Sequence, residues 1–72
     1  MRWHVAQGGY PHGWESPFLK TDDANEAMRA YEEWTPQHMM TVAIFDDQKG
    51  EGAPLDPHAV EEILDQEYED AA

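Results

Sequence analysis

Residues 39–45, with the sequence MMTVAIF, form the only long apolar run of the chain, and the run ends abruptly at Asp46 and Asp47. Its length, its β-branched and aromatic content and the turn-forming residues 46–52 after it favour a buried strand over a helix. We expect this strand to be the centre of the fold.

The two faces of this strand have different requirements. Alternation places Met40, Val42 and Ile44 on one face, where two helices can shield them. Met39 and Phe45 lie on the other face, and they need a lid from an aromatic loop, a second copy of the chain or a partner.

The residues before this strand predict three further elements and a loop. Residues 2–7 can form a short strand with Trp3 and Val5 on one face, and residues 16–20 can form another. Between them, residues 7–15 hold three glycines and a proline and predict a loop.

A first helix follows, capped by Thr21 or Asp22 and running to about Trp34, where Thr35 and Pro36 stop it. Arg29 lies on its charged side at i,i+3 and i,i+4 spacings that allow ion pairs. One apolar face is formed by residues at helical spacing: Ala24, Ala27, Met28, Tyr31 and Trp34.

A second helix is predicted to begin with Asp56 as N-cap and Pro57 at its first position. Its buried stripe is expected to consist of Val60, Ile63, Leu64 and Tyr68. Glu67 falls inside the apolar arc, so we expect packing to end there and residues 67–72 to fray.

The predicted order is strand, an optional second strand, helix, strand, helix. The fold class is α+β: one domain over residues 1–72, with a two- or three-stranded sheet and both helices packed on one face. A chain of 72 residues buries only about 60% of its unfolded surface, so the core is small.

The composition limits the possible partners. The formal charge is −12, and residues 46–72 carry −9 of it, with Lys49 as their single Lys or Arg. Direct binding to nucleic acid or an anionic membrane is not expected, because both need basic patches. No cysteine, signal-peptide h-region or apolar run long enough for a membrane span occurs, and we expect a cytoplasmic protein.

The acidic second helix is the sharpest functional feature. Residues 61–70 hold six carboxylates, about one per 2.5 Å of helix, whereas duplex DNA carries about one charge per 1.7 Å. Such a helix can imitate a row of phosphates and occupy a basic channel on another protein. The candidate partner-binding acids are Asp46, Asp47, Glu51, Glu61, Glu62, Asp65 and Glu69.

Two plainer interpretations of these acids stay open. They can be a solvated face that keeps a small protein in solution, or an adaptation to high salt. Against the first stands the near absence of compensating lysines, since ordinary surfaces mix both signs. Against the second stands the richness in Trp, Tyr and Met.

The glycine-rich loop carries Tyr10 and Trp14, which can anchor an interface or cover the core; Trp3 is expected in the core. The four histidines have no metal-ligand spacing, and neither a phosphate-binding loop nor an activated nucleophile occurs. We therefore expect no metal, no cofactor and no enzyme activity, and a metal-dependent or hydrolytic enzyme is the weakest interpretation.

In size, charge and α/β pattern the chain resembles the small acidic inhibitors encoded by phages and mobile elements, the anti-CRISPR and antirestriction proteins, several of which imitate DNA. The resemblance implies evasion of host defence, with a target such as a CRISPR effector subunit or a restriction enzyme bound at its basic surface. The alternative is a general protein-interaction module, monomeric or homodimeric, whose acids only solvate it.

Overall fold

Strand β1 (Trp3–Gly9) is the centre of the sheet in the computed structural model, which describes residues 1–49 and 52–71. Strand β4 (Thr41–Asp46) pairs antiparallel with one edge of β1, in a register that runs from Trp3 opposite Asp46 to Gly8 opposite Thr41. The apolar run was predicted to be the central strand, and this was wrong. It has β1 on one side only, and its outer edge is partly closed by two backbone hydrogen bonds between Ile44 and Leu55 (2.9 and 2.8 Å).

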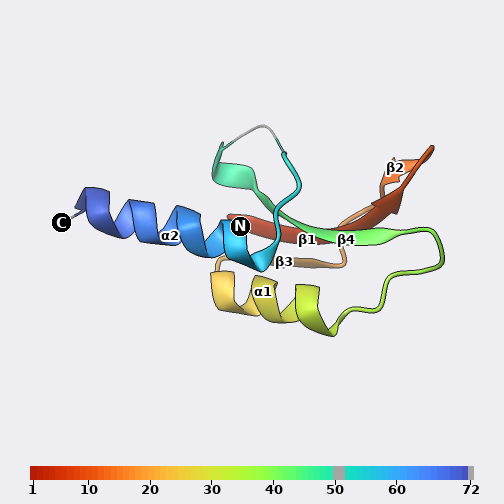
Figure 1. Ribbon diagram of the computed structural model, residues 1–72, viewed down its shortest axis with the longest axis horizontal. Coiled ribbons are helices and arrows are strands. Elements are labelled where there is room, and N and C mark those ends of the chain that lie inside the picture. Colours follow the sequence, from red (N-terminus) through yellow and green to blue (C-terminus); the bar gives the residue numbers. More distant parts are fainter. Residues whose placement is uncertain (50–51, 72) are drawn as a thin grey trace.

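Two short strands follow one another along the opposite edge of β1. Strand β3 (Leu19–Thr21) pairs antiparallel with the beginning of β1, and strand β2 (Gly13–Trp14) pairs antiparallel with its end. The sheet therefore has four strands, where two or three were predicted. The α+β class, with helices on one face of an antiparallel sheet, is confirmed (Figure 1).

The glycine-rich segment was predicted to be a loop and instead forms a hairpin between β1 and β2. A side chain on Gly8 would place its Cβ 2.5 Å from the carbonyl oxygen of Gly13, and one on Gly9 would lie 2.5 Å from that of Met39. The missing side chains let neighbouring backbones approach closely, so here glycine builds the sheet.

Helix α1 (Ala24–Glu33) begins at Asp23, whose Oδ1 accepts hydrogen bonds from the amides of Asn25 (2.9 Å) and Glu26 (3.4 Å). The cap was predicted at Thr21 or Asp22; Thr21 instead accepts the amide of Asp23 at 3.0 Å and shapes the turn before the helix. The predicted end near Trp34 is confirmed.

Helix α2 (Pro57–Ala71) begins as predicted, with Asp56 Oδ1 accepting the amide of Ala59 at 2.8 Å. Its packing stripe is shorter than predicted, because Val60 is buried, Ile63 and Leu64 are half-buried, and Tyr68 is 78% exposed. The helix is continuous to Ala71, whereas fraying was predicted from residue 67. A short 3₁₀ turn, η1 (Asp47–Lys49), follows β4.

The core lies between the sheet and the two helices. Its fully buried side chains are Trp3, Val5, Ala27, Ile44 and Val60. A second, smaller cluster of Ala6, Ala43 and Phe45 lies on the opposite face of the sheet.

The far face of the apolar strand is closed by the chain itself. The ring of His4 stacks on Phe45 at a centroid distance of 4.7 Å, and Trp14 contacts the same ring edge-on at 5.1 Å. Phe45 is therefore only 4% exposed, and no partner is needed to cover it. Met39 was predicted to belong to this strand but lies in the turn before β4, and it remains exposed.

The molecule is elongated, with extents of 43 × 24 × 19 Å. The C-terminal part of α2 extends past the sheet at one end, and the β1–β2 hairpin lies at the opposite end (Figure 1). Neither described helix combines the length and the apolar character needed to cross a membrane.

Candidate protein-interaction surface

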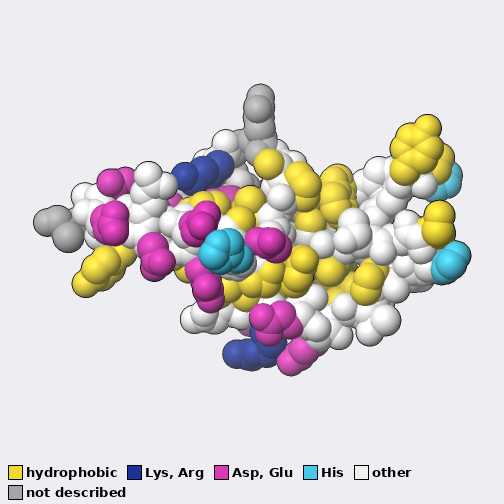
Figure 2. Space-filling model, in the orientation of Figure 1, with side chains coloured by type: hydrophobic (Ala, Val, Ile, Leu, Met, Phe, Trp, Pro, Cys, Tyr) yellow, Lys and Arg dark blue, Asp and Glu magenta, His cyan; other side chains and the backbone are white. Residues whose placement is uncertain are grey.

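The second half of α2 presents acidic side chains to solvent. Leu64 is the last residue of α2 that packs against the core. The C-terminal part of the helix extends past the sheet (Figure 1), and acidic side chains lie on this projecting part (Figure 2). Glu61, Asp65 and Glu69 follow each other at i,i+4 spacing, about 6 Å apart along the axis. The exposed acids of this helix are Glu61, Glu62, Asp65, Glu69 and Asp70, and we call them the acidic track.

Almost no positive charge offsets the acidic track. Among the described side chains, only His58 lies within ion-pairing distance of one of its members, with Nε2 3.0 Å from Glu62 Oε1. The last turn of α2 contains no basic residue. Because the C-terminal end of a helix is the negative end of its dipole, Glu69 and Asp70 lie where carboxylates destabilise a helix. Helix stability does not explain their position.

The predicted site residues before α2 do not join this track. Asp46 is 5% exposed and turned towards the protein interior, where Arg2 binds it. Asp47 is exposed but its Oδ2 lies 2.8 Å from His4 Nδ1, on the far face of the sheet. Glu51 lies outside the described residues.

Arg2 holds α2 against the end of the sheet. Its Nε and Nη2 donate to the two carboxylate oxygens of Asp46 at 3.0 and 2.9 Å, and its Nη1 and Nη2 donate to those of Glu67 at 2.9 and 2.6 Å. The guanidinium also lies 4.6 Å from the ring centre of Trp3. The Arg2 side chain thus joins the residue before β1, the end of β4 and the second half of α2.

The sequence interpretation missed this cluster. Glu67 was taken as the point where packing ends, yet it lies in the apolar arc because it faces the guanidinium of Arg2. Hydrogen bonds from Arg2 hold the pKa of both Asp46 and Glu67 below the ordinary carboxyl value. An acid inside an apolar helical stripe is the signal that indicates a cation on the opposing element.

The lowered pKa of Asp46 predicts a dependence of stability on pH. A carboxyl whose pKa is depressed on folding stabilises the folded state above its unfolded pKa of about 3.9, and this contribution is lost as the pH falls below that value. The other acids act in the opposite direction, because their mutual repulsion also disappears in acid. We expect the difference in unfolding free energy between the wild type and Asp46→Asn to be largest at neutral pH and to shrink below about pH 4.

Urea unfolding of both proteins across this pH range measures that difference. The repulsion among the other acids is present in both proteins, so it cancels in the difference. A difference that stays constant down to about pH 2 would show that the ionised Asp46 carboxylate contributes nothing beyond the shape of its side chain.

Tyr10 and Trp14, which were predicted either to anchor an interface or to cover the core, lie in different environments. Trp14 is 42% exposed and covers Phe45, so it serves the core with one edge and faces solvent with the other. Tyr10 is 97% exposed at the tip of the hairpin and covers nothing. Both lie at the end of the molecule opposite the acidic track (Figure 1).

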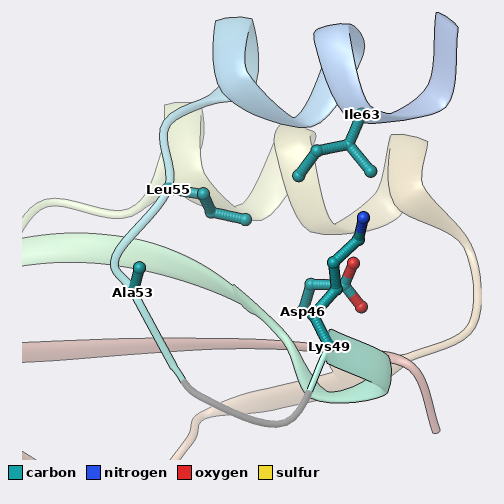
Figure 3. A pocket seen from close by; sticks show the side chains of 5 residues that line it. All are labelled: Asp46, Lys49, Ala53, Leu55 and Ile63. Carbon is teal, nitrogen blue, oxygen red and sulfur yellow. The ribbon is translucent and has the colours of Figure 1, made fainter. Parts of the chain in front are cut away.

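One cavity lies beneath α2, between the helix and β4 (Figure 3). Its volume of about 140 Å³ is below the range of about 300–1,000 Å³ typical of small-molecule sites. It is lined by Asp46, Lys49, Ala53, Leu55 and Ile63. Within residues 1–49 and 52–71, no three His, Asp or Glu side chains come together in a way that could hold a metal ion.

Comparisons with protein-family models, with curated proteins and with solved structures find no match to this chain. The fold and surface define a small acidic α+β protein with a projecting acidic helix. Charge and shape are therefore the properties of this chain that bear on its function.

Proposed function

We propose that this protein is a stoichiometric inhibitor that places α2 in the basic nucleic-acid-binding surface of another protein. The acidic track imitates a row of phosphates there. The observation that carries the proposal is that Glu61, Glu62, Asp65, Glu69 and Asp70 are all exposed on one projecting helix that has no basic residue in its last turn.

The spacing of these acids supports the proposal. The track places five carboxylates along residues 61–70, about one per 3 Å of helix axis. Duplex DNA carries about one charge per 1.7 Å of its axis. The lysines and arginines of a groove that neutralises such a duplex can instead pair with the carboxylates of this helix. Like nucleic-acid binding, the association would release counterions from the target, and it would be fast at low salt and weaker at high salt.

The rigid attachment of α2 to the body of the protein also supports the proposal. Arg2 fixes Glu67, which lies between Asp65 and Glu69 in sequence, to the body of the protein. A mimic loses less entropy on binding when its charges are already held in place. The resemblance to anti-CRISPR and antirestriction proteins suggests a defence or DNA-handling protein as the target, which would place the inhibitor in the cytoplasm.

The proposal is tested by capture from a lysate of the native host on the immobilised protein, followed by elution with duplex DNA. We expect a retained protein that itself binds nucleic acid and that DNA releases. A partner that DNA does not displace would contradict mimicry and would favour the alternative, a general interaction module whose acids only solvate it.

A matched control for the capture replaces four exposed acids outside α2 by Gln. It changes the net charge by the same amount as replacing four acids of α2 by their amides. The four residues are Glu15, Glu26, Glu32 and Glu33. We expect this bait to retain the partner, because the contact depends on the position of the charges. Loss of the partner from this bait would mean that only the overall charge matters.

A further inference from the structure

One end of the molecule carries no Asp, Glu, Lys or Arg. It consists of residues 8–14 and 34–42, sixteen positions in a chain with 20 charged residues among 72. The two segments lie side by side, since Gly8 pairs with Thr41 and a Cβ on Gly9 would lie 2.5 Å from the carbonyl oxygen of Met39. We call them the uncharged end; in Figure 2 hydrophobic and His side chains gather there, away from the acids of α2.

Large apolar side chains are exposed at this end. Tyr10 is 97% exposed, Met39 80%, Trp14 42% and Trp34 38%, and they make up four of the six large hydrophobic residues that the described structure leaves exposed. Exposed apolar side chains that gather in one place indicate a contact surface more strongly than the same side chains scattered.

Both the backbone conformation and the exposure of Met39 are unfavourable in a monomer. Its backbone has a φ of 66°, the left-handed region that costs a residue with a side chain about 1 kcal/mol or more relative to glycine. Its side chain points into solvent and adds nothing to the core. A residue that is strained and exposed at once indicates a role outside the folding of the monomer.

We propose that the uncharged end is an interface between two copies of this chain. The charge distribution selects the place where two copies can meet, because two chains of charge −12 repel each other wherever acids meet acids. When the copies meet through their uncharged ends, the acidic tracks point away from each other. Given the 43 Å length of each copy, the tracks are then separated by several Debye lengths, each about 8 Å at physiological salt.

The shape of the end also fits a second copy. Beside Tyr10 and Trp14 lies a shallow hollow of about 210 Å³ whose floor includes Gly8, Gly9 and Thr41. A two-fold arrangement lets each copy supply a protruding side chain and a hollow to the other. The four exposed side chains, Tyr10, Trp14, Trp34 and Met39, present roughly 500 Å² per copy, or about 1,000 Å² for two copies, taking about 200 Å² for a large side chain. The interface therefore lies near the lower limit of specific ones, about 1,000 Å² in total, and we expect a dissociation constant on the order of 10⁻⁵ M.

Sedimentation of the purified full chain from about 1 µM to about 1 mM tests the proposal. We expect the mass to double within this range, and the dimer to be as strong or stronger at high salt, since screening reduces the repulsion between copies. The inhibitor proposal predicts the opposite salt dependence for the target. The two ideas are independent and can fail separately.

Two variants locate the interface. Met39→Gly should weaken the dimer at least 10-fold while thermal stability stays equal or rises, because glycine accepts the left-handed conformation. Tyr10→Ser should also weaken it, whereas Tyr68→Ser, which removes a side chain that is 78% exposed on α2, should not. A monomer at every concentration and salt would overturn the proposal, and so would Met39→Gly and Tyr10→Ser variants that associate as strongly as the wild type.

Discussion

Replacing the four leading acids of the track by their amides, in the variant Glu61→Gln, Glu62→Gln, Asp65→Asn and Glu69→Gln, is expected to weaken binding to the target about 100-fold at low salt. Each charge facing a lysine or arginine in a desolvated groove contributes on the order of 0.5–1 kcal/mol, and every factor of ten in affinity corresponds to about 1.4 kcal/mol. The salt dependence of the remaining affinity should be flatter, because fewer counterions are released.

The same variant should fold at least as well as the wild type. None of the four side chains is buried, and all four lie beyond the first turn of α2, with Asp65 and Glu69 in the half nearer the negative end of the helix dipole. Calorimetry on the binding of both proteins to the captured target, together with a thermal melt, measures the two effects. The control with Gln at Glu15, Glu26, Glu32 and Glu33 should keep its affinity within a few-fold. An unchanged affinity in the α2 variant would exclude the acidic track as the contact surface.

Removing the guanidinium of Arg2 is expected to cause a large loss of stability for a substitution outside the apolar core. In Arg2→Met the carboxylate of Asp46, which is 5% exposed, loses both hydrogen bonds from the guanidinium and its only cationic partner among the described residues, and keeps only the hydrogen bond from the Gln48 amide to Oδ1 (3.1 Å). Leaving a buried charge without its partner costs about 3–5 kcal/mol, and the 20% exposure of the Arg2 side chain lowers the expectation to about 2–3 kcal/mol. In a domain of this size that corresponds to a fall in Tm of roughly 10–20 °C.

The loss should have a local signature on α2. Without Arg2, Glu67 is no longer held, and the amides of the last turns of α2 should exchange with solvent much faster. Arg29→Met is the matched control, because Arg29 is exposed and pairs with no acid among the described residues; it should change stability by less than about 0.5 kcal/mol. Equal stabilities for Arg2→Met and Arg29→Met would contradict the role given to Arg2.

The parts of the fold that were predictable depend on short-range chemistry. Asp56 followed by Pro57 specifies the start of α2 through a cap and a fixed φ, and the structure has it at that place. The alternation of Trp3 and Val5 placed both correctly in the core. These features need only neighbouring residues, so one sequence is sufficient to find them.

The parts that were missed depend on contacts between distant residues. Arg2 binds partners 44 and 65 positions away. Glu67 inside the apolar stripe indicates a cation opposite it, but no local pattern identifies that cation as Arg2. The central strand was misplaced because β1 draws its burial from three neighbouring strands, whereas the apolar run is recognisable by composition alone. From the sequence alone, Gly8 and Gly9 indicate the end of a strand. Their role in the sheet becomes clear only from the backbones that approach them closely.

The same contacts revise the candidate site. Asp46 belonged to the predicted track by sequence proximity, but it is bound by Arg2 and faces inwards. The acids that remain are those of α2, where helical geometry alone sets their spacing. The candidate surface is therefore narrower than the acidic segment 46–72, and its helix is held by a contact with Arg2 that was not predicted from the sequence.

The most direct test of the central claim is a competition between this protein and duplex DNA for the purified target. If α2 occupies the DNA-binding surface, adding the protein will raise the apparent Kd of the target for labelled DNA in proportion to its concentration. The maximum amount of DNA bound will stay unchanged, and no complex will contain all three components. A ternary complex of target, DNA and this protein, or a reduced maximum with an unchanged Kd, would contradict the account.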